Sequence, residues 1–330
     1  MTHFDSIGRD RRSRGSNPAP DSYYGHPIVK EPVWELGIPI YFFFGGLAGA
    51  SAALALGARL TGNARLARNA TFAGMVGVVA SPPLLIRDLG KPARFAAMLR
   101  VIKVTSPMNV GTWLLNATGG GLSVAAGCEL LGILPRLRDL ATTGSGLFGL
   151  PFATYTAALV ADTAIPAWHE ARRELPFVFI GGAASAAGGA AAIITPPSDA
   201  GAARRFAIAG ALVELAAGFV MEHRLGLLGE PYSQGRAGRL TRLSRVTAGA
   251  GAAVMALAGR RRIGATAAGS LLLAGALLER LAVFEAGRQS ARDPRYVVDA
   301  QRRRVAAGTS RGASTFAGLP DERETLPAAS

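Results

Sequence analysis

Cysteine and histidine are scarce in this 330-residue chain, and their absence excludes several kinds of site. The single cysteine, Cys128, lies in an apolar segment, so the chain has no intrachain disulfide and cannot by itself hold a structural zinc or an iron–sulfur cluster. All four histidines lie outside the apolar runs, whereas a transmembrane b-type haem needs imidazoles within opposed helices. The sequence therefore predicts no metal site, no haem and no iron–sulfur cluster in this chain.

Acidic residues are also few, and a cleavable signal peptide is not evident. The chain has 36 Lys and Arg against 22 Asp and Glu, a formal charge of +14, while 49% of its residues are hydrophobic. Its arginines punctuate apolar runs instead of forming one patch, which favours membrane topology signals over nucleic-acid binding. This distribution of arginines predicts no nucleic-acid partner. Residues 1–21 are polar and arginine-rich and have no apolar periodicity, so we expect a disordered N-terminal tail.

Long uncharged runs indicate an all-α integral membrane protein, because about 20 apolar residues cross a bilayer as a helix. Eight candidate spans lie near residues 36–58, 69–86, 104–128, 140–161, 175–198, 203–221, 246–259 and 263–278. The last two are short for a full crossing, which leaves a re-entrant pair open as an alternative. We predict a bundle of about eight transmembrane helices over residues 22–285, followed by a polar C-terminal tail over residues 286–330.

The loop after the second span has the pattern of a short helix in the membrane interface. Pro92 suits the first turn of a helix, where its missing N–H is not needed. Phe95, Met98, Leu99 and Ile102 then recur at helical spacing, with basic residues away from that stripe. We therefore expect an interfacial helix between the second and third spans.

Polar residues flank this loop on both sides. Asp88 stands at the exit of the second span, where a carboxylate is costly unless it has a function or a partner. Ser106-Pro107 restarts a helix and places Asn109 and Trp113 in its first turns. The simple alternative is an ordinary loop in which Asp88 pairs with a nearby cation: Arg87, Lys91 or Arg94.

An eight-span count brings several polar features to one membrane face. These are His26, Glu35, Asp88, Asn109, Asp162, His169, Glu222, His223 and Glu279, the last five at the ends of the fourth, sixth and eighth spans. Loops on this face are the richer in Lys and Arg, which predicts that both termini are cytoplasmic. Glu214 alone lies within a span; such a residue suggests a proton relay, and the alternative is a pair with a neighbouring hydroxyl or amide.

The sequence RDLGKPARF, followed by SPMNVGTW, resembles the NrfD-like or polysulfide-reductase family of membrane anchors. The family's pattern is D-x-G-[RK]-P-x-R-[FW] and then S-P-M-x-x-G-x-W, and the WELGIPIYFFFGGLAGASA run resembles its first helix. The resemblance is strongest over residues 22–170, and Lys91 stands where the family often has arginine. It implies a quinone-reactive anchor that is not catalytic alone. It also implies a four-cluster ferredoxin-type iron–sulfur partner and a molybdenum or tungsten bis-pterin catalytic subunit.

Quinone chemistry requires proton donors at both ring oxygens and a route for protons to water. Together with the resemblance, this requirement predicts His26, Asp88 and Tyr155 as catalytic residues. Asn109 and Trp113 join them in the predicted binding site for a menaquinone or ubiquinone substrate. The predicted proton path comprises three carboxylates: Glu35, Asp162 and Glu214.

Two other functions are compatible with an apolar, polytopic chain in the cell (inner) membrane. In a proton-coupled secondary transporter, Glu214 and the carboxylates at span ends would couple protons to a solute. The chain has no clear inverted repeat, however, and its polar groups gather at one face instead of the midplane. The other alternative is a purely structural membrane anchor.

Overall fold

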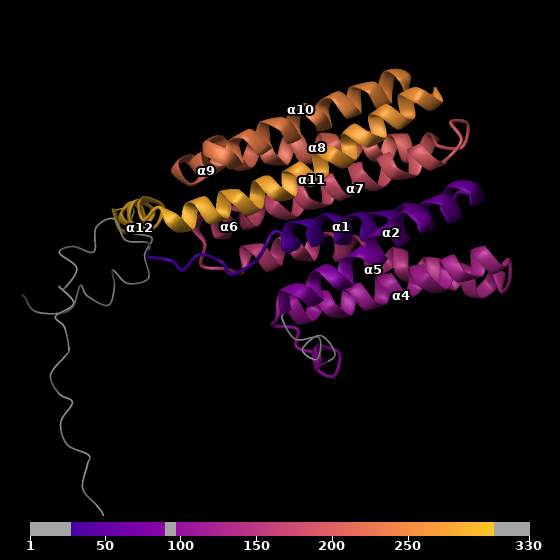
Figure 1. The fold of residues 1–330 in the computed structure, drawn as a ribbon, viewed down its shortest axis with the longest axis horizontal. Helices are drawn as coiled ribbons and strands as arrows, with labels where there is room; N and C mark the ends of the chain where they lie inside the picture. The colour runs from indigo at the N-terminus through magenta and orange to yellow at the C-terminus, as the bar shows by residue number, and fades with distance from the viewer. Residues whose placement is uncertain (1–27, 90–96, 307–330) are drawn as a thin grey trace, which may run out of the picture.

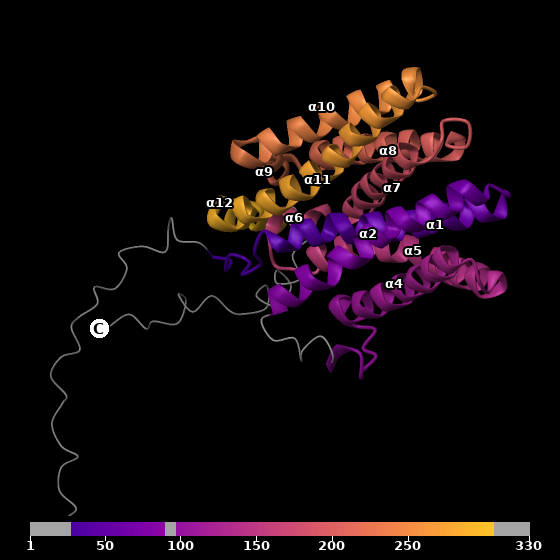
Figure 2. The ribbon, with the colours of Figure 1, turned by 45° about the vertical axis from the view of Figure 1, so that its right-hand side comes forward.

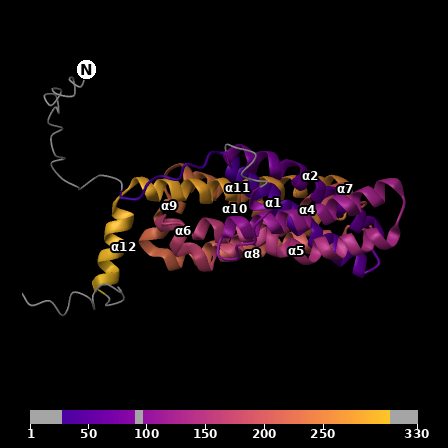
Figure 3. The same cartoon turned by 90° about the horizontal axis from the view of Figure 1, so that it is seen from below.

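A computed structural model describes residues 28–89 and 97–306, and every regular element in these ranges is a helix (Figure 1). The long helices are α1 Gly37–Leu60, α2 Ala64–Leu89, α4 Pro107–Leu131, α5 Pro135–Ala161, α7 Leu175–Ile194, α8 Gly201–Leu225, α10 Gly235–Ala258 and α11 Arg262–Arg292. The short ones are α6 Pro166–Glu170, η1 Ala171–Arg173, η2 Gly226–Gly229, α9 Glu230–Ser233 and α12 Arg295–Ala306. The long helices lie side by side along the long axis of the molecule, while α12 turns away from that axis at one end (Figure 3).

Length and composition make this an all-α membrane protein. Within the described residues, 6 helical stretches are long and apolar enough to cross a bilayer: α1, α2, α5, α7, α11, and α8 with its continuation to Ser233. α4 and α10 do not reach this level of apolarity. α10 begins well before the expected residue 246, and its first turns carry Arg236, Arg239 and Arg242. The count of about eight crossings therefore stays a prediction, and it depends on these two helices.

By their contacts, the long helices form two groups of four, and the two groups lie beside each other in Figures 1 and 2. Helices α1, α2, α4 and α5 make one group, and α7, α8, α10 and α11 make the other. The groups join where α1 packs against α7 and α11, and where α5 packs against α7. Short connections join α1 to α2, α4 to α5, α7 to α8 and α10 to α11, and the two helices of each pair run antiparallel.

Glycines set the closest approaches between helices. A Cβ added to Gly49 of α1 would lie 2.3 Å from the carbonyl oxygen of Gly149 on α5. A Cβ on Gly181 of α7 would lie 2.5 Å from the backbone nitrogen of Glu214 on α8. The backbones of these helices are therefore in contact, which is the arrangement small residues allow in membrane bundles.

The start of the described chain is tied to the end of α11. Glu31 accepts hydrogen bonds from Arg288 at 2.7 Å and from Arg292 at 2.7 Å. These contacts place the entry to α1 and the exit from α11 at the same end of the bundle. An even number of long helices between them is consistent with this placement.

The C-terminal part of the bundle is longer than predicted. The expected eighth span ends at residue 278, and the expected tail begins at residue 286, yet α11 continues to Arg292 and α12 follows it. Glu279, expected at a span end, therefore lies inside α11 and is buried. Small residues explain the extension, because Ala286, Gly287 and Ala291 form a buried stripe within a segment whose charges suggest a tail.

Other predictions fall partly or wholly outside the described residues. The expected disordered tail over residues 1–21 and His26 lie outside them, as does the start of the expected interfacial helix at Pro92. In the part of that loop which is described, Ala97 and Met98 are helical. The backbone then turns, and Ile102 is 72% exposed beyond the end of the helix.

The glycine contact between α1 and α5 generates a test of packing. Gly49→Ala should lower the apparent Tm in detergent, since overpacking of this kind costs about 1–3 kcal/mol. Gly57→Ala on the same helix is the matched control, because a Cβ there would meet no atom within 4 Å. The control should keep or raise Tm, as alanine favours a helix over glycine by about 1 kcal/mol. Equal Tm values for the two variants would contradict the close approach.

The ion pair at the entry to α1 predicts a pH dependence. The hydrogen bond from Arg292 holds the pKa of Glu31 below its ordinary value of 4.5. A lowered folded-state pKa stabilises the protein above the unfolded pKa, and this stabilisation is lost as pH falls through the folded pKa. Glu31→Gln should therefore lower Tm at neutral pH. The loss in free energy of unfolding should be at most about 1 kcal/mol, because the pair is partly exposed. The difference from wild type should shrink to zero in acid; a difference that grew in acid would contradict the pair.

Candidate functional site

Two buried tyrosines meet between α1 and α5. The hydroxyl groups of Tyr41 and Tyr155 share a hydrogen bond. Tyr155 also stacks on Phe152, with 5.6 Å between ring centroids and 14° between ring planes. A buried phenol is stabilised by a polar partner, and here each hydroxyl supplies the other's. The pair has two O–H hydrogens and uses one between its members, so one remains for a further acceptor.

The glycine of the SPMNVGTW segment makes room for Tyr155. A Cβ added to Gly111 of α4 would lie 1.9 Å from Cε2 of the Tyr155 ring. Any side chain at this position would displace the ring, so α4 can seat Tyr155 only because residue 111 is glycine. The structure thus joins a motif recognised in the sequence to a tyrosine more than 40 residues further along the chain.

Asn109 and Trp113 hold the loop that precedes α4. The Asn109 Oδ1 atom accepts a hydrogen bond from the Lys103 backbone N–H at 2.6 Å, and its Nδ2 donates to the carbonyls of Met98 and Val101, each at 2.9 Å. Trp113 donates its Nε1–H to the Val101 carbonyl at 3.2 Å. Both N–H hydrogens of the Asn109 amide are therefore engaged by backbone. These contacts describe a loop-positioning role, and quinone contact by either residue stays a prediction.

Asp88 lies at the end of α2 beside the entry to α1. Its Oδ1 accepts a hydrogen bond from the Glu35 backbone N–H at 3.4 Å, while Arg87 lies 3.9 Å from the Glu35 carboxylate. Arg87 is therefore directed to Glu35, and Lys91 and Arg94 lie outside the described residues. One turn before Asp88, the buried Leu85 belongs to the same apolar cluster as the tyrosine pair. Asp88 is thus half-buried at the polar end of that cluster.

Aromatic stacking fixes the segment that leads into α1. Trp34 stacks on Trp168 of α6 with ring centroids 5.7 Å apart, and it meets Phe42 edge-on. Trp168 is fully buried and donates its Nε1–H to the Val283 carbonyl of α11 at 2.7 Å. The residues just before α1 are therefore held against both helix groups. His26 precedes this anchored segment and lies outside the described residues.

The three carboxylates of the predicted proton path do not meet. Glu35 is exposed beside Asp88, and Asp162 is exposed at the end of α5. Glu214 is buried on α8, in the other group of helices. Among the described residues no hydrogen bond or ion pair joins any two of the three. His169 is also exposed, and its Nδ1 lies 3.2 Å from the Ala161 carbonyl oxygen.

Sequence reasoning missed two buried polar residues. Tyr41 is the only tyrosine in the first apolar run, and that phenol in an uncharged helix was the available signal. Arg280, 2% exposed, is a cation on a helix whose span was expected to end at residue 278. Within the described part of the chain, no three His, Cys, Asp or Glu side chains come together as a metal site.

Comparison with known proteins covers the first group of helices and α7. A family profile described as "Polysulphide reductase, NrfD" matches residues 27–196. No curated protein matches the chain. The matched residues include the tyrosine pair, Asp88 and the glycine that seats Tyr155, whereas Glu214 and Arg280 lie beyond them. Because the profile matches more than half of the chain, this multi-pass membrane protein belongs to the polysulphide reductase NrfD family.

Proposed function

We propose that this chain is the quinone-reactive membrane subunit of a respiratory oxidoreductase complex. Membership of the NrfD family supports a role as the membrane subunit of a polysulfide reductase or a related complex. The observation that carries the finer proposal is the tyrosine pair, because Gly111 of the motif seats Tyr155 with a hydroxyl hydrogen to spare. Asp88 lies at the polar end of the same cluster.

The chemistry is a two-electron, two-proton exchange: quinone, two electrons and two protons give quinol. In this proposal the Tyr155 hydroxyl donates a hydrogen bond to one ring oxygen, and Tyr41 holds that hydroxyl in place. His26 serves the other ring oxygen. Asp88 exchanges protons with water, since it is half-buried and lies next to the exposed Glu35. A carboxylate at the edge of the hydrocarbon is suited to that exchange.

Electrons require partner subunits in this proposal. They pass to or from a four-cluster ferredoxin-type iron–sulfur subunit, and beyond it lies a molybdenum or tungsten bis-pterin catalytic subunit. We place the iron–sulfur subunit at the end of the bundle that holds Asp88 and Glu35. With the predicted orientation this is the cytoplasmic end of a cell-membrane protein. Glu35 and Asp162, both exposed at that end, are proposed as the outer steps of the proton path.

Asp88→Asn tests the site in the purified complex in lipid. Quinone-linked turnover should fall by about 10²-fold, the usual contribution of a positioned proton-transfer group. Asn keeps the hydrogen-bond acceptor for the Glu35 N–H, so assembly should be unchanged. Asp139→Asn is the control, because Asp139 is a 49%-exposed carboxylate at the start of α5, at the opposite end of the bundle. Unchanged turnover in an assembled Asp88→Asn complex would favour a purely structural anchor.

The tyrosine pair gives a second test with an internal comparison. Tyr155→Phe removes the hydroxyl proposed to contact quinone, whereas Tyr41→Phe removes only its neighbour. Turnover and apparent quinone affinity should both fall in Tyr155→Phe, by about 1–3 kcal/mol if a buried acceptor is left unpaired. Tyr41→Phe should show a smaller loss with the same sign. A larger loss in Tyr41→Phe would show that Tyr41, and not Tyr155, contacts the quinone.

A further inference from the structure

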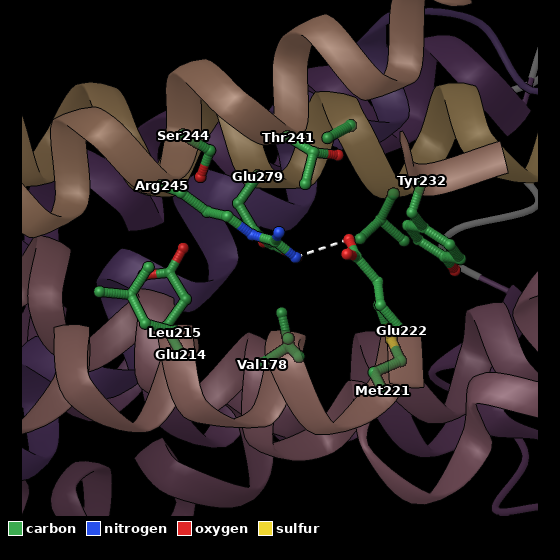
Figure 4. Close-up of a pocket in the computed structure, with 13 residues that line it drawn as sticks. Val178, Glu214, Leu215, Met221, Glu222, Tyr232, Thr241, Ser244, Arg245 and Glu279 are labelled. Atoms are coloured by element: carbon green, nitrogen blue, oxygen red, sulfur yellow. Dashed lines mark hydrogen bonds and ion pairs between the residues drawn. The ribbon is translucent and has the colours of Figure 1, made fainter. Parts of the chain in front are cut away.

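A small cavity lies within the second group of helices, and all of its lining residues except Val178 lie beyond the residues that the family profile covers (Figure 4). Its volume is about 40 Å³. Polar residues from four helices line it: Glu214 and Glu222 of α8, Tyr232 of α9, Thr241 and Arg245 of α10, and Glu279 of α11. A buried site with three carboxyl groups is unusual in a membrane bundle, because each charge must be balanced.

Arg280 is fixed next to this cavity by three contacts. It donates to the carboxylate of its neighbour Glu279, and its Nη2 donates to the Phe179 carbonyl at 2.5 Å. The guanidinium also lies over the Phe179 ring, with 3.8 Å from Cζ to the ring centroid. Glu279 is therefore the ion-pair partner of a buried cation, although its Oε1 has no hydrogen-bond partner.

Glu214 is buried without such a partner. It is 4% exposed, and its Oε2 makes no hydrogen bond. Gly182 of α7 has no side chain and leaves room for Glu214 and Arg280. A Cβ at Gly182 would lie 3.5 Å from both the Glu214 Oε2 and the Arg280 Nη2. Glu214 thus lies near the guanidinium, and among the described residues no ion pair joins the two.

The charges around the cavity balance only if one carboxyl is protonated. Arg245 reaches from α10 to Glu222 on α8 at 2.5 Å, which pairs those two charges (Figure 4). Arg280 and Glu279 pair on α11. No charged side chain of α7 lines the cavity, and α9 contributes only the neutral Tyr232. Ionised Glu214 would be an unpaired buried charge, whereas one proton on it restores neutrality.

Water has room to reach Glu214. A water molecule needs about 10–15 Å³ of such a cavity, so a few fit. The hydroxyls of Thr241 and Ser244 donate to backbone carbonyls of Ala237 and Gly275 and keep lone pairs for water. The Arg245–Glu222 pair is partly exposed, at 37% and 20%, and gives the cavity a polar side at the surface of the protein.

We propose that Glu214 is a buried, protonated carboxylic acid that exchanges its proton with water in this cavity, while Glu279 stays ionised beside Arg280. The exchange is Glu214–COOH plus water to carboxylate plus hydronium. The Arg245–Glu222 pair lies between the cavity water and bulk solvent. This makes the second group of helices a separate proton-binding site, and it does not depend on the proposed quinone site.

Infrared spectroscopy of the full chain in lipid tests the assignment directly. Wild type should show the carbonyl stretch of a protonated carboxylic acid, and the band should shift to lower frequency in D₂O. Glu214→Gln should remove this band. Glu174→Gln is the matched control, because Glu174 is a buried carboxylate held by two nitrogens of Arg224. The band should persist in the control. A wild-type band that survives Glu214→Gln, or that does not shift in D₂O, would overturn the proposal.

Stability separates the roles of the two carboxyls. Gln has the shape of a protonated glutamic acid, so Glu214→Gln should leave the apparent Tm close to wild type. Glu279→Gln leaves Arg280 buried without its counter-ion and should lower Tm strongly. If that variant does not fold, the double change Glu279→Gln with Arg280→Met should recover folded protein and retain the infrared band. Loss of the band in the folded double variant would assign the proton to Glu279 and overturn the proposal.

Discussion

The bundle depends on helices that approach until their backbones touch. Lipid is as apolar as a leucine side chain, so helices in a membrane gain little from burying apolar surface and rely on close packing instead. Gly49 against Gly149 joins α1 to α5, and Gly181 against the Glu214 backbone joins α7 to α8. The first contact joins the two helices that carry Tyr41 and Tyr155, and the second involves the backbone of Glu214 itself. Polar chemistry in this protein is therefore positioned by residues that have no side chain.

The same principle places the tyrosine pair. Gly111 lets the Tyr155 ring lie against α4, and α1 brings Tyr41 to its hydroxyl. Asn109 and Trp113 then hold the loop before α4 by bonding its backbone, and Asp88 bonds the backbone at the entry to α1. Asp88, Asn109 and Trp113 of the recognised motifs thus form their hydrogen bonds with backbone groups. The result is an end of the bundle that several hydrogen bonds hold together, with one tyrosine hydroxyl hydrogen left for a further acceptor.

Two polar clusters lie in separate groups of helices. The first, around Tyr155 and Asp88, lies within the family match, and Asp88 is at its polar end. The second, around Glu214 and Arg280, lies among α7, α8, α10 and α11, and of these helices only α7 lies within that match. No hydrogen bond or ion pair among the described residues links Glu214 with Glu35 or Asp162. The low dielectric around both clusters makes every unpaired charge costly. The protonation state of each titratable side chain therefore depends on its hydrogen-bond and ion-pair partners.

The sequence by itself determined the fold class, the family and most helix positions, because uncharged runs and an ungapped motif are local features. It also located Asp88, Tyr155 and Glu214 as polar groups in apolar surroundings. Tertiary structure decided which of them meet. Tyr41 became a partner of Tyr155 only when α1 packed on α5. Glu279 was expected at a span end but is buried, because α11 continues past it along a stripe of small residues. The charged residues of that segment suggested a tail instead. Pairing across more than 100 residues depends on helix packing, and no local pattern encodes it.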